Sequence, residues 1–530
     1  MGRAVTDVAL ATYDYGREAM QATIGVDGDF AEGKWRYNAY YGRGKQEQDM
    51  QLHDLVLAEQ FFNAIDAVIG PNGTPVCRVA LTDPGSACRP LNLFGSGRAD
   101  PAAVDYVTAT WRSIQNTWLD TAGISLSGEP FELWNQPVSF ATGVEYRKES
   151  FETRYDENSL ADRFATINGI NIPEVGIDVT EAFVEVAVPL LADLPMVQSL
   201  NFNGAARISD YSTSGSIWSW KLGGTWHLVE DFKLRATRSR DIRAPNLEEL
   251  FSTPGTFFTN VQDISQTPPS TTQVVLFTGG NPSLDPEIAD TVTVGAVYSP
   301  SFLPGFEVSL DYYDIQIDDV ITTLTAQEII NSCYQQGNQS ACGQITRNGA
   351  GTITEINATY INIAQFINKG FDFEASYRTH LDAIGLSGQL TTRVLANYVD
   401  TLAVDNGIVT IDGADYLGSQ ATFLVPKWRG SVTVSYESDV IGADLRARYL
   451  DGGGYAPPTV LANLGNNHIA SRTYVDLGLR GYVPMLGDSR LTIYGNVQNV
   501  FDKEPALGAV NSPYFDIIGR YFTLGLRANF

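Results

Sequence analysis

Apolar and polar residues alternate along much of the chain, which places every second side chain on the same face of an extended strand. At the C-terminal end, the apolar positions are Phe522, Leu524, Leu526, Ala528 and Phe530. The same alternation recurs upstream, over residues 389–397, 431–436, 443–449 and 475–480. One face of each such strand suits lipid and the other suits water. The pattern therefore predicts a protein built mostly from amphipathic β-strands.

The connections between these strands alternate in length. Short turns are predicted near residues 28–33, 129–135, 191–196, 229–231, 301–305, 382–386, 437–441 and 484–488. Long connections are predicted near residues 53–109, 154–176, 241–287, 321–365, 402–426, 452–469 and 502–516, with one tight turn near 212–215 where a long one is due. Short inner turns and long outer loops are typical of membrane β-barrels, whereas a soluble sandwich has no reason to keep its long loops on one side. We therefore predict a barrel wall of about 16 to 18 strands.

Hydropathy excludes a helical membrane protein. Mean hydropathy is −0.10 over 530 residues, and no stretch reaches the roughly 18 apolar residues of a spanning helix. The best candidate, residues 184–197, is interrupted by Glu185, Asp193 and two prolines. The 25 Tyr, 25 Phe and 8 Trp residues suit the aromatic girdles of a barrel, although soluble strands also favour aromatic residues. The expected fold class is all-β, a large transmembrane antiparallel β-barrel with long extracellular loops.

The net charge and the chemically reactive residues exclude several classes of function. The net charge is 35 − 61 = −26, which argues against a nucleic-acid partner because such proteins need a basic face. The histidines are scattered and lack metal-ligand spacing, at His53, His227, His380 and His468. The sequence contains no zinc-protease, serine-hydrolase or phosphate-loop motif. We therefore expect no enzyme activity, no cofactor and no metal site.

The four cysteines form two close pairs, Cys77 with Cys88 and Cys333 with Cys342. Neither pair has the two-residue spacing of a zinc site. Short-loop disulfides formed in an oxidising compartment are the favoured interpretation, and free buried thiols are the alternative. If the last strand ends on the inner side of the membrane, counting strands backwards places both pairs in outer loops.

Five short sequence segments, taken together and in their order along the chain, point to a known protein family. Arg243, Pro245 and Glu249 lie in the first, which spans residues 238–251. The second spans residues 281–287 and reads Asn-Pro-Ser-Leu-Asp-Pro-Glu. The other three lie at residues 370–372, 499–503 and 519–522. Together these segments resemble the barrel of TonB-dependent outer-membrane receptors.

The resemblance covers most of residues 110–530 and, more loosely, residues 18–110. It implies a barrel of about 22 strands that is filled by an N-terminal plug. It also implies an active-transport receptor for a scarce ligand such as an iron–siderophore, a vitamin or an oligosaccharide. Energy would come from the inner-membrane TonB complex, which contacts a short TonB box next to the plug. The alternative is a passive, substrate-specific channel that has no plug.

Neither a plug nor a TonB box is visible in the sequence, and residues 1–7 lack the apolar segment of a signal peptide. The predicted strands are also fewer than the family's barrel contains. We therefore expect residues 1–530 to be the C-terminal barrel portion of a receptor, with its signal peptide, TonB box and plug outside this sequence. An open sheet edge is not tolerated in lipid, so this chain alone should not make a working receptor.

The last strand resembles the signal that the outer-membrane barrel assembly machinery reads. Its residues would be Thr523, Gly525, Ala528 and Phe530. The family resemblance places such a protein in the bacterial outer membrane, in contact with lipopolysaccharide. Arg238 and Arg240 fall on the lipid-facing side near the outer end of a strand, where they would meet lipopolysaccharide phosphates or form a salt bridge.

Charged residues also fall on the face that would line the interior. The arginines expected there are Arg393, Arg446, Arg448, Arg480 and Arg527. The resemblance implies that such residues hold the plug. The alternative is that they are simply solvated by a watery interior.

Overall fold

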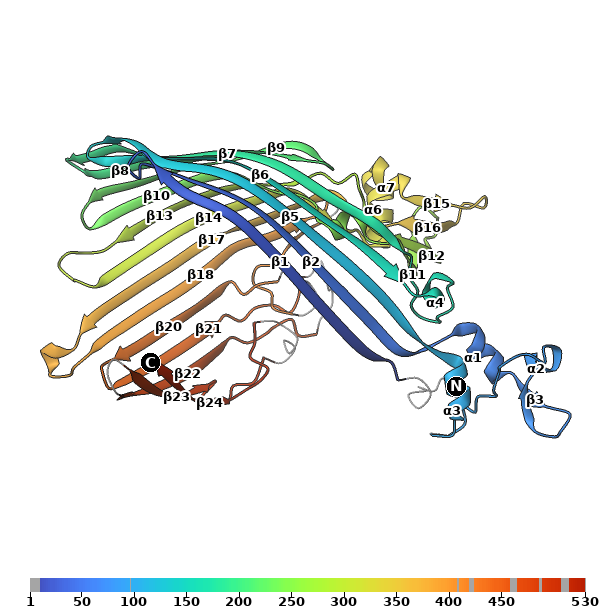
Figure 1. The fold of residues 1–530 in the computed structure, drawn as a ribbon. Helices are drawn as coiled ribbons and strands as arrows, with labels where there is room; N and C mark the ends of the chain where they lie inside the picture. The colour runs from blue at the N-terminus through green and yellow to red at the C-terminus, as the bar shows by residue number, and fades with distance from the viewer. Residues whose placement is uncertain are drawn as a thin grey trace.

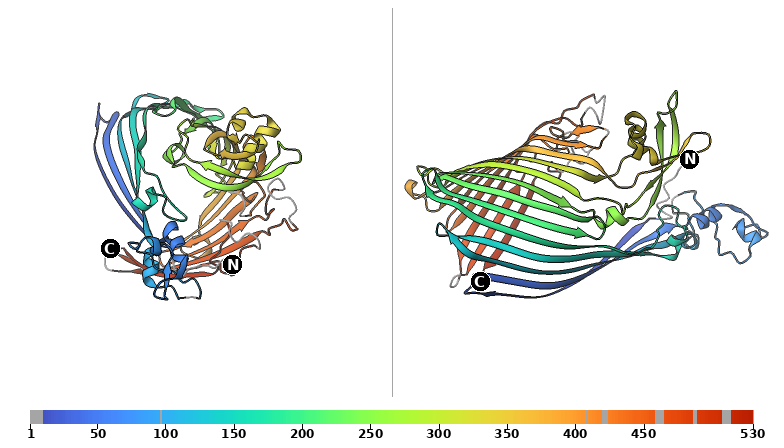
Figure 2. Two further views of the ribbon diagram at one scale, coloured as in Figure 1. Left: turned by 90° about the vertical axis from the view of Figure 1, so that its right-hand side faces the viewer. Right: turned by 90° about the horizontal axis from the view of Figure 1, so that it is seen from above.

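A computed structural model describes residues 10–95, 97–407, 409–418, 424–457, 465–485, 489–506 and 514–529. One large antiparallel sheet curves into a trough, and helices with small strands occupy the connections at one end (Figures 1 and 2). The predicted all-β class is confirmed. No helix in these ranges is long and apolar enough to cross a membrane.

The large sheet is built from strands that pair mostly in chain order. From edge to edge it runs through β1 (Thr12–Phe30), β2 (Trp35–Val56), β5 (Thr108–Leu133), β6 (Gln136–Tyr155), β7 (Ile172–Leu194), β8 (Val197–Tyr211), β9 (Gly215–Val229), β10 (Phe232–Arg243), β13 (Glu287–Tyr298), β14 (Phe306–Thr322), β17 (Ile361–His380), β18 (Gln389–Asp405), β20 (Trp428–Glu437), β21 (Ile441–Leu450), β22 (Arg472–Pro484), β23 (Arg490–Gln498) and β24 (Tyr521–Asn529). The short β19 (Thr410–Asp412) pairs with β18 and brings the sheet to 18 strands. This count agrees with the predicted range of about 16 to 18.

The alternation of the sequence sets the two faces of the sheet, because successive side chains of a strand point to opposite sides. Leu445 on β21 and Leu524 and Leu526 on β24 lie on the apolar face, where they are 48%, 82% and 69% exposed. Apolar side chains this exposed are expected where a barrel meets lipid. The arginines predicted to line the interior alternate with them and lie on the polar face.

Short and long connections alternate along the chain as predicted. The short ones join β1 to β2, β5 to β6, β7 to β8 and the later pairs at one end of the sheet, which we call the inner end. The long ones gather at the opposite, outer end, where Figure 1 shows the helices. The tight turn at residues 212–214 between β8 and β9 is the exception at the outer end, also as predicted.

Strand length differs across the sheet. β5 has 26 residues and β7 has 23, whereas β23 and β24 have 9 each. At about 3.3 Å per residue, a strand as long as β5 extends over roughly 85 Å, well beyond a hydrocarbon layer about 30 Å thick. The first half of the sheet therefore continues far outside the layer that the apolar face would occupy.

One outer body combines segments of two different long connections, and we call it the cap. The connection between β10 and β13 supplies β11 (Gly255–Asp263) and β12 (Ser270–Thr278). The connection between β14 and β17 supplies α6 (Ala326–Gln336), α7 (Gln339–Gly343), β15 (Ile345–Arg347) and β16 (Ile353–Asn357). β12 pairs with β16 in parallel, which joins the two connections into one four-stranded sheet.

A second outer body forms within a single connection, and we call it the satellite. It comprises α1 (Ala58–Ile65), β3 (Ala67–Ile69), β4 (Pro75–Cys77), α2 (Val79–Thr82) and α3 (Pro101–Val107). The satellite projects from the outer ends of β2 and β5 (blue in Figure 1). The remaining helical turns are α4 (Glu157–Leu160), α5 (Leu247–Phe251) and η1 (Asp382–Ile384).

The large sheet is open along one side. Among the described residues, β1 pairs only with β2, and β24 pairs only with β23. Both edge strands run from the outer end to the inner end. The trough in Figure 2 is therefore bounded by two strands that point the same way.

Candidate functional site at the outer rim and on the polar face

The first two sequence segments meet at the outer rim of the sheet. Arg243, at the end of β10, donates from Nε to Oε2 of Glu287 at 2.7 Å and from Nη1 to Oε2 of Glu249 at 2.9 Å. Glu249 also belongs to a capping box with Asn246 at the start of α5, and Pro245 is buried beside it. The structure thus brings Arg243 and Glu249 together, and Glu287 completes the group.

The same group ties the rim to its neighbours. Oε1 of Glu287 accepts a hydrogen bond from the backbone N–H of Ile321 at 2.8 Å. Beneath it, Leu250, Leu284 and Ile321 form a buried cluster. Carboxylates that receive several charge-assisted hydrogen bonds hold their partners firmly. The rim group therefore fixes the points from which both connections of the cap leave the sheet.

Three of the five arginines on the polar face are neutralised within the wall. Arg393 pairs with Glu374 at 2.8 Å, Arg448 pairs with Asp476 at 2.9 Å, and Arg480 pairs with Asp444 at 2.8 Å. These partners lie on adjacent strands, where register places opposite charges side by side. The sequence suggested two roles for these arginines, contact with a plug or solvation by a watery interior. Pairing within the sheet is a third role.

The other two arginines of that set are free. The guanidinium groups of Arg446 on β21 and Arg527 on β24 make no ion pair or hydrogen bond with any residue in the described ranges. On the apolar face, Arg240 donates from Nη2 and Nε to the carboxylate of Asp290, at 2.8 and 3.1 Å. The salt-bridge alternative therefore holds for Arg240.

The residues of the expected assembly signal lie along β24. Thr523, Gly525 and Ala528 pair with Asn496, Tyr494 and Leu491 of β23. A Cβ at position 525 would collide with the far end of the Tyr494 ring, so glycine lets that ring lie across β24. Phe530 lies outside the described residues.

A cavity of about 660 Å³ crosses the polar face, from the inner part of β10 and β14 to the outer ends of β20, β21 and β22. Four arginines line it, from β10, β20 and β21, together with tyrosines from β22 and an outer connection, namely Arg235, Arg429, Arg446, Arg448, Tyr474 and Tyr514. Arg235 is neutralised by Asp311, with which it makes two hydrogen bonds of 2.7 and 2.6 Å. Sequence reasoning missed Arg429 and the cavity, because no local pattern shows which strands face each other.

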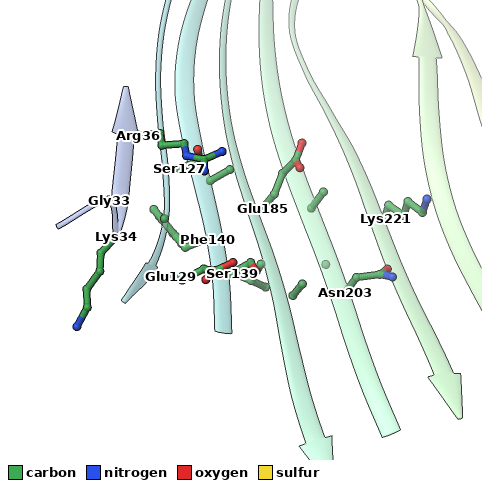
Figure 3. Close-up of a pocket in the computed structure, with 16 residues that line it drawn as sticks. Gly33, Lys34, Arg36, Ser127, Glu129, Ser139, Phe140, Glu185, Asn203 and Lys221 are labelled. Atoms are coloured by element: carbon green, nitrogen blue, oxygen red, sulfur yellow. The ribbon is translucent and has the colours of Figure 1, made fainter. Parts of the chain in front are cut away.

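A second cavity of about 580 Å³ lies near the inner end, over β2 and β5 to β9 (Figure 3). Its charged residues come from β2, β5, β7 and β9 and from the turn that precedes β2. Figure 3 labels among them Lys34, Arg36, Glu129, Glu185 and Lys221. Within the described part of the chain, these five side chains form no ion pairs with each other or with other residues.

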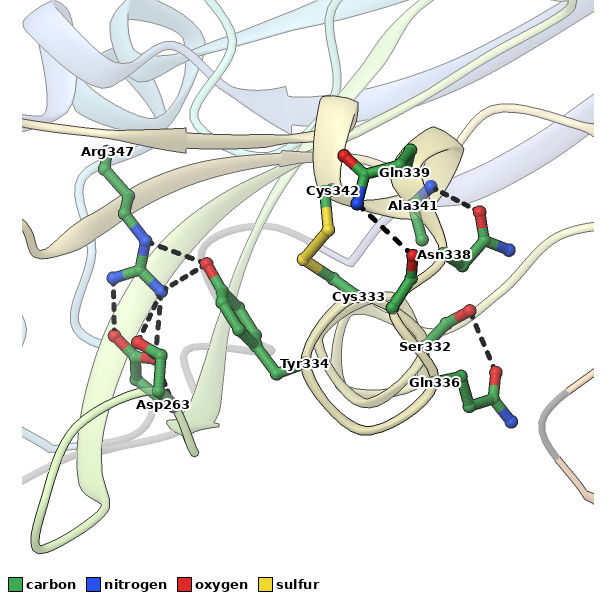
Figure 4. The surroundings of a disulfide bond; sticks show 12 residues. Asp263, Ser332, Cys333, Tyr334, Gln336, Asn338, Gln339, Ala341, Cys342 and Arg347 are labelled. Carbon is green, nitrogen blue, oxygen red and sulfur yellow. Dashed lines mark hydrogen bonds and ion pairs between the residues drawn. A yellow bond between two sulfur atoms is a disulfide. The ribbon is translucent and has the colours of Figure 1, made fainter.

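The cap is held together by a disulfide and a buried ion pair (Figure 4). Cys333 is joined to Cys342. Arg347 of β15 donates to both carboxylate oxygens of Asp263 on β11, at 2.7 and 3.0 Å, and also to the Tyr334 hydroxyl. These hydrogen bonds from Arg347 lower the pKa of Asp263 to about 2. The carboxylate therefore stays charged at any physiological pH.

The satellite also contains a disulfide, between Cys77 and Cys88. Both cysteine pairs therefore lie in outer connections, and no cysteine in the described residues is free. In the same ranges, no group of three or more His, Cys, Asp or Glu side chains is arranged to hold a metal ion.

The family model for TonB-dependent receptor-like β-barrels matches residues 4–500. The chain therefore belongs to the TonB-dependent receptor β-barrel family, as the five sequence segments predicted. Comparison with curated protein sequences finds no significant match.

Three solved structures illustrate the similarity of fold. The siderophore receptor PirA from Acinetobacter baumannii matches with a TM-score of 0.54 and 15% identity, over 93% of this chain and 62% of that one. A variant of the ferric enterobactin receptor PfeA from Pseudomonas aeruginosa matches with a TM-score of 0.56 and 13% identity, over the same shares of 93% and 62%. A complex of FpvAI with pyocin S2 gives 0.53 and 13%, over 96% and 56%. The chain thus spans less than two thirds of each of these structures, and the likeness at these identities concerns the fold.

Proposed function

We propose that this chain forms the barrel wall and outer loops of a bacterial outer-membrane receptor that takes up a scarce ligand with energy transduced by TonB. The observation that carries the proposal is the family match over residues 4–500, together with the rim group that joins Arg243, Glu249 and Glu287. The siderophore receptors among the similar structures favour an iron–siderophore as the ligand. A vitamin and an oligosaccharide are the other ligand classes.

The open sheet supports a larger assembly than the described residues form. A row of unpaired backbone groups is too costly in hydrocarbon, so β1 and β24 must gain partners in a membrane. Because both strands run toward the inner end, pairing them directly would be parallel. Antiparallel closure instead needs an odd number of further strands. We propose that the complete receptor supplies these strands and a plug that contacts TonB.

Transport in this proposal is conformational and needs no covalent chemistry. The outer loops and the cavity beneath them receive the ligand, and the TonB complex moves the plug to open a path along the polar face. The family and the similar structures are transport receptors rather than enzymes. Assembly into the membrane would depend on the last strand, and Arg238 at the outer girdle would contact lipopolysaccharide phosphates.

The proposal is tested by uptake in cells whose only receptor for the probe is the complete protein. Ferric enterobactin, cobalamin and maltotriose are supplied in labelled form, with and without TonB. We expect one of them to accumulate, and the accumulation to fall to background when TonB is removed. If none accumulates in either strain, the proposal is wrong.

A passive, substrate-specific channel is the rival function. It predicts accumulation that continues without TonB, and steady ion conductance by the purified receptor in planar bilayers. The proposed receptor predicts neither result, because a plugged barrel conducts little until TonB acts on it.

A further inference from the structure

The four-stranded sheet of the cap has two edges, and they differ in how well they are protected. Its strand order is β11-β12-β16-β15, so β11 and β15 are the edge strands. β15 has only 3 residues and carries Arg347, and short or charged edge strands resist further pairing. β11 has 9 residues, contains no proline, lysine or arginine, and pairs with β12 without a bulge. The β11 edge therefore lacks the features that usually keep an edge strand from pairing again.

The backbone groups of β11 point alternately toward β12 and away from it, as in any antiparallel pair. Gln262 shows which set points away, because its N–H and C=O bind the side chain of Gln327 on α6, at 2.7 and 3.1 Å. By the same alternation, the backbone groups of Thr256, Phe258 and Asn260 also point away from β12. Within the described ranges, β11 pairs with β12 alone. Each of these three residues thus offers one free donor and one free acceptor.

Gln327 indicates which chemical group this edge accepts. A side-chain amide carries a donor and an acceptor in the same planar arrangement as a peptide bond. At Gln262 the Gln327 amide accepts one hydrogen bond and donates another, as the backbone of a neighbouring strand would. The amide is held in place on α6, where its Nε2 also donates to Asn331 at 3.1 Å. An amide therefore already occupies one end of the edge, and the rest of the edge is open.

The side chains along the open part of β11 are uncharged and exposed. Successive side chains of a strand lie on opposite faces, so Phe257 and Phe258 flank the edge on its two sides. They are 58% and 71% exposed. Thr256 and Asn260 share the face of Phe258 and are exposed as well. Residues 252–262 include no charged side chain, in a chain whose net charge is −26. A strand added here would meet a phenyl ring on either face and no charge.

The position of the cap keeps this edge away from the barrel interior. The cap leaves the sheet from β10, β13, β14 and β17, which lie in its middle, whereas further strands would join at β1 and β24. The rim group of Arg243, Glu249 and Glu287 marks the end of the wall, and the cap stands beyond it. A plug that fills the barrel would lie on the other side of this rim. Figure 2 shows the outer end face-on, with the cap beside the opening of the trough.

We propose that the open edge of β11 binds an extended, uncharged peptide, which adds to the sheet of the cap as a further strand. Main-chain hydrogen bonds to Thr256, Phe258 and Asn260 hold the peptide, and the rings of Phe257 and Phe258 contact its side chains. The inference rests on the proposed uptake function, because it names the class of molecule that the outer mouth receives. A second copy of the receptor is the other occupant of such an edge, and the test separates the two.

The test measures binding of a fluorescent peptide to the complete receptor extracted from outer membranes. The probe is a short peptide of alternating threonine and valine, N-methylated along one edge so that it cannot form fibrils with itself. It still pairs through its other edge. The control peptide is N-methylated along both edges and has no N–H left to donate. We expect fluorescence anisotropy to show saturable binding of the probe, with a Kd below about 1 mM, and no binding of the control.

Position 260 allows a matched pair of variants. Asn260→Pro removes an N–H that points away from β12, so it blocks an added strand and leaves the pairing of β11 with β12 in place. Asn260→Ala keeps that N–H. We expect Asn260→Pro to weaken binding of the probe by about tenfold or more, and Asn260→Ala to weaken it by no more than about threefold. Hydrogen exchange across β12 and α6 should be the same in both variants, which shows that the cap remains folded.

The inference is wrong if the probe shows no saturable binding, if the control peptide binds equally well, or if the two folded variants bind the probe equally. If Asn260→Pro does not fold, the comparison of the two peptides on the unmodified receptor decides. Mass photometry tests the other occupant, because loss of a receptor dimer in Asn260→Pro, without loss of peptide binding, would assign the edge to a second copy. Binding by the isolated receptor needs no TonB. Uptake that proves independent of TonB would therefore end the uptake proposal while leaving the peptide site in place.

Discussion

The cap and the satellite are both outer bodies with one disulfide, yet different forces hold them. The core of the cap consists of large aliphatic side chains, among which Ile329, Ile330 and Ile356 are at most 1% exposed. The core of the satellite is smaller, because beside its cystine it buries only Ala64, Leu91, Ala103 and Val107 among the described residues. Burying more apolar surface stabilises more, so the cap depends less on its covalent bond than the satellite does.

The ion pairs of the two bodies also differ in burial, and again the cap has the more buried one. In the cap, the side chains of Arg347 and Asp263 are 22% and 2% exposed. In the satellite, those of Arg78 and Asp66 are 63% and 52% exposed. Solvent screens an exposed pair, whereas breaking a buried one leaves an uncompensated charge. The same two residue types therefore contribute differently to the two bodies, according to how deeply the fold buries them.

Removing the disulfides should give the largest effect and the clearest contrast. The cysteines are 11 residues apart in the satellite and 9 apart in the cap, so either bond restricts the unfolded chain by a similar amount, about 2–3 kcal/mol. We expect Cys77→Ser with Cys88→Ser to abolish amide protection across residues 58–107. Cys333→Ser with Cys342→Ser should leave most protection in the cap. Hydrogen exchange followed by mass spectrometry checks both, and equal losses in the two bodies would contradict the comparison.

Lowering the pH should give the second-largest effect, a loss of stability in the cap. The pKa of Asp263 is lowered to about 2 by its hydrogen bonds from Arg347, whereas an unfolded aspartate titrates near about 3.9. The stabilisation is thus complete above pH 4 or so and is lost as the pH falls through about 2, and it amounts to roughly 2 kcal/mol. Amide protection of the cap, measured from pH 6 downwards, should decline over that window.

Asp263→Asn provides the control for this acid effect. Because the amide cannot ionise, the variant should show reduced protection of the cap already at pH 6 and little further decline before general acid unfolding. The satellite, measured in the same samples, reports that general unfolding. A parallel acid profile in the variant and the unmodified chain would rule out Asp263 as the source.

Local patterns were sufficient to predict the strands and the connections. Period-two alternation and the spacing of turns predicted the class, the strand number and the alternation of short and long connections, because these depend on neighbours in sequence. Segment 238–251 likewise pointed to the outer rim. The role of Glu287 in that rim group could be recognised only once β10 and β13 were paired, since 44 positions separate it from Arg243.

Long-range register explains what sequence reasoning missed. Arg446 and Arg448 have the same parity on one strand, yet only Arg448 is neutralised, because it takes the carboxylate that lies opposite Arg446. Arg347 and Asp263 lie 84 positions apart in different connections. In each case the sequence shows a charged residue at a strand position. It does not show that residue's partner, because the partner depends on which strands lie next to each other.

The smallest expected effect is that of Arg78→Ala in the satellite. Arg78 donates to both oxygens of Asp66, at 2.9 and 3.2 Å, but both side chains are mostly in solvent and gain little from pairing. Exchange rates across residues 58–107 should therefore change by no more than a few-fold. The equivalent change in the cap, Arg347→Ala, removes the partner of a buried carboxylate and should expose β11 and β15 to exchange. If Arg78→Ala proved as damaging as Arg347→Ala, burial would not be what separates the two bodies, and the geometry of the pairing itself would have to carry the difference.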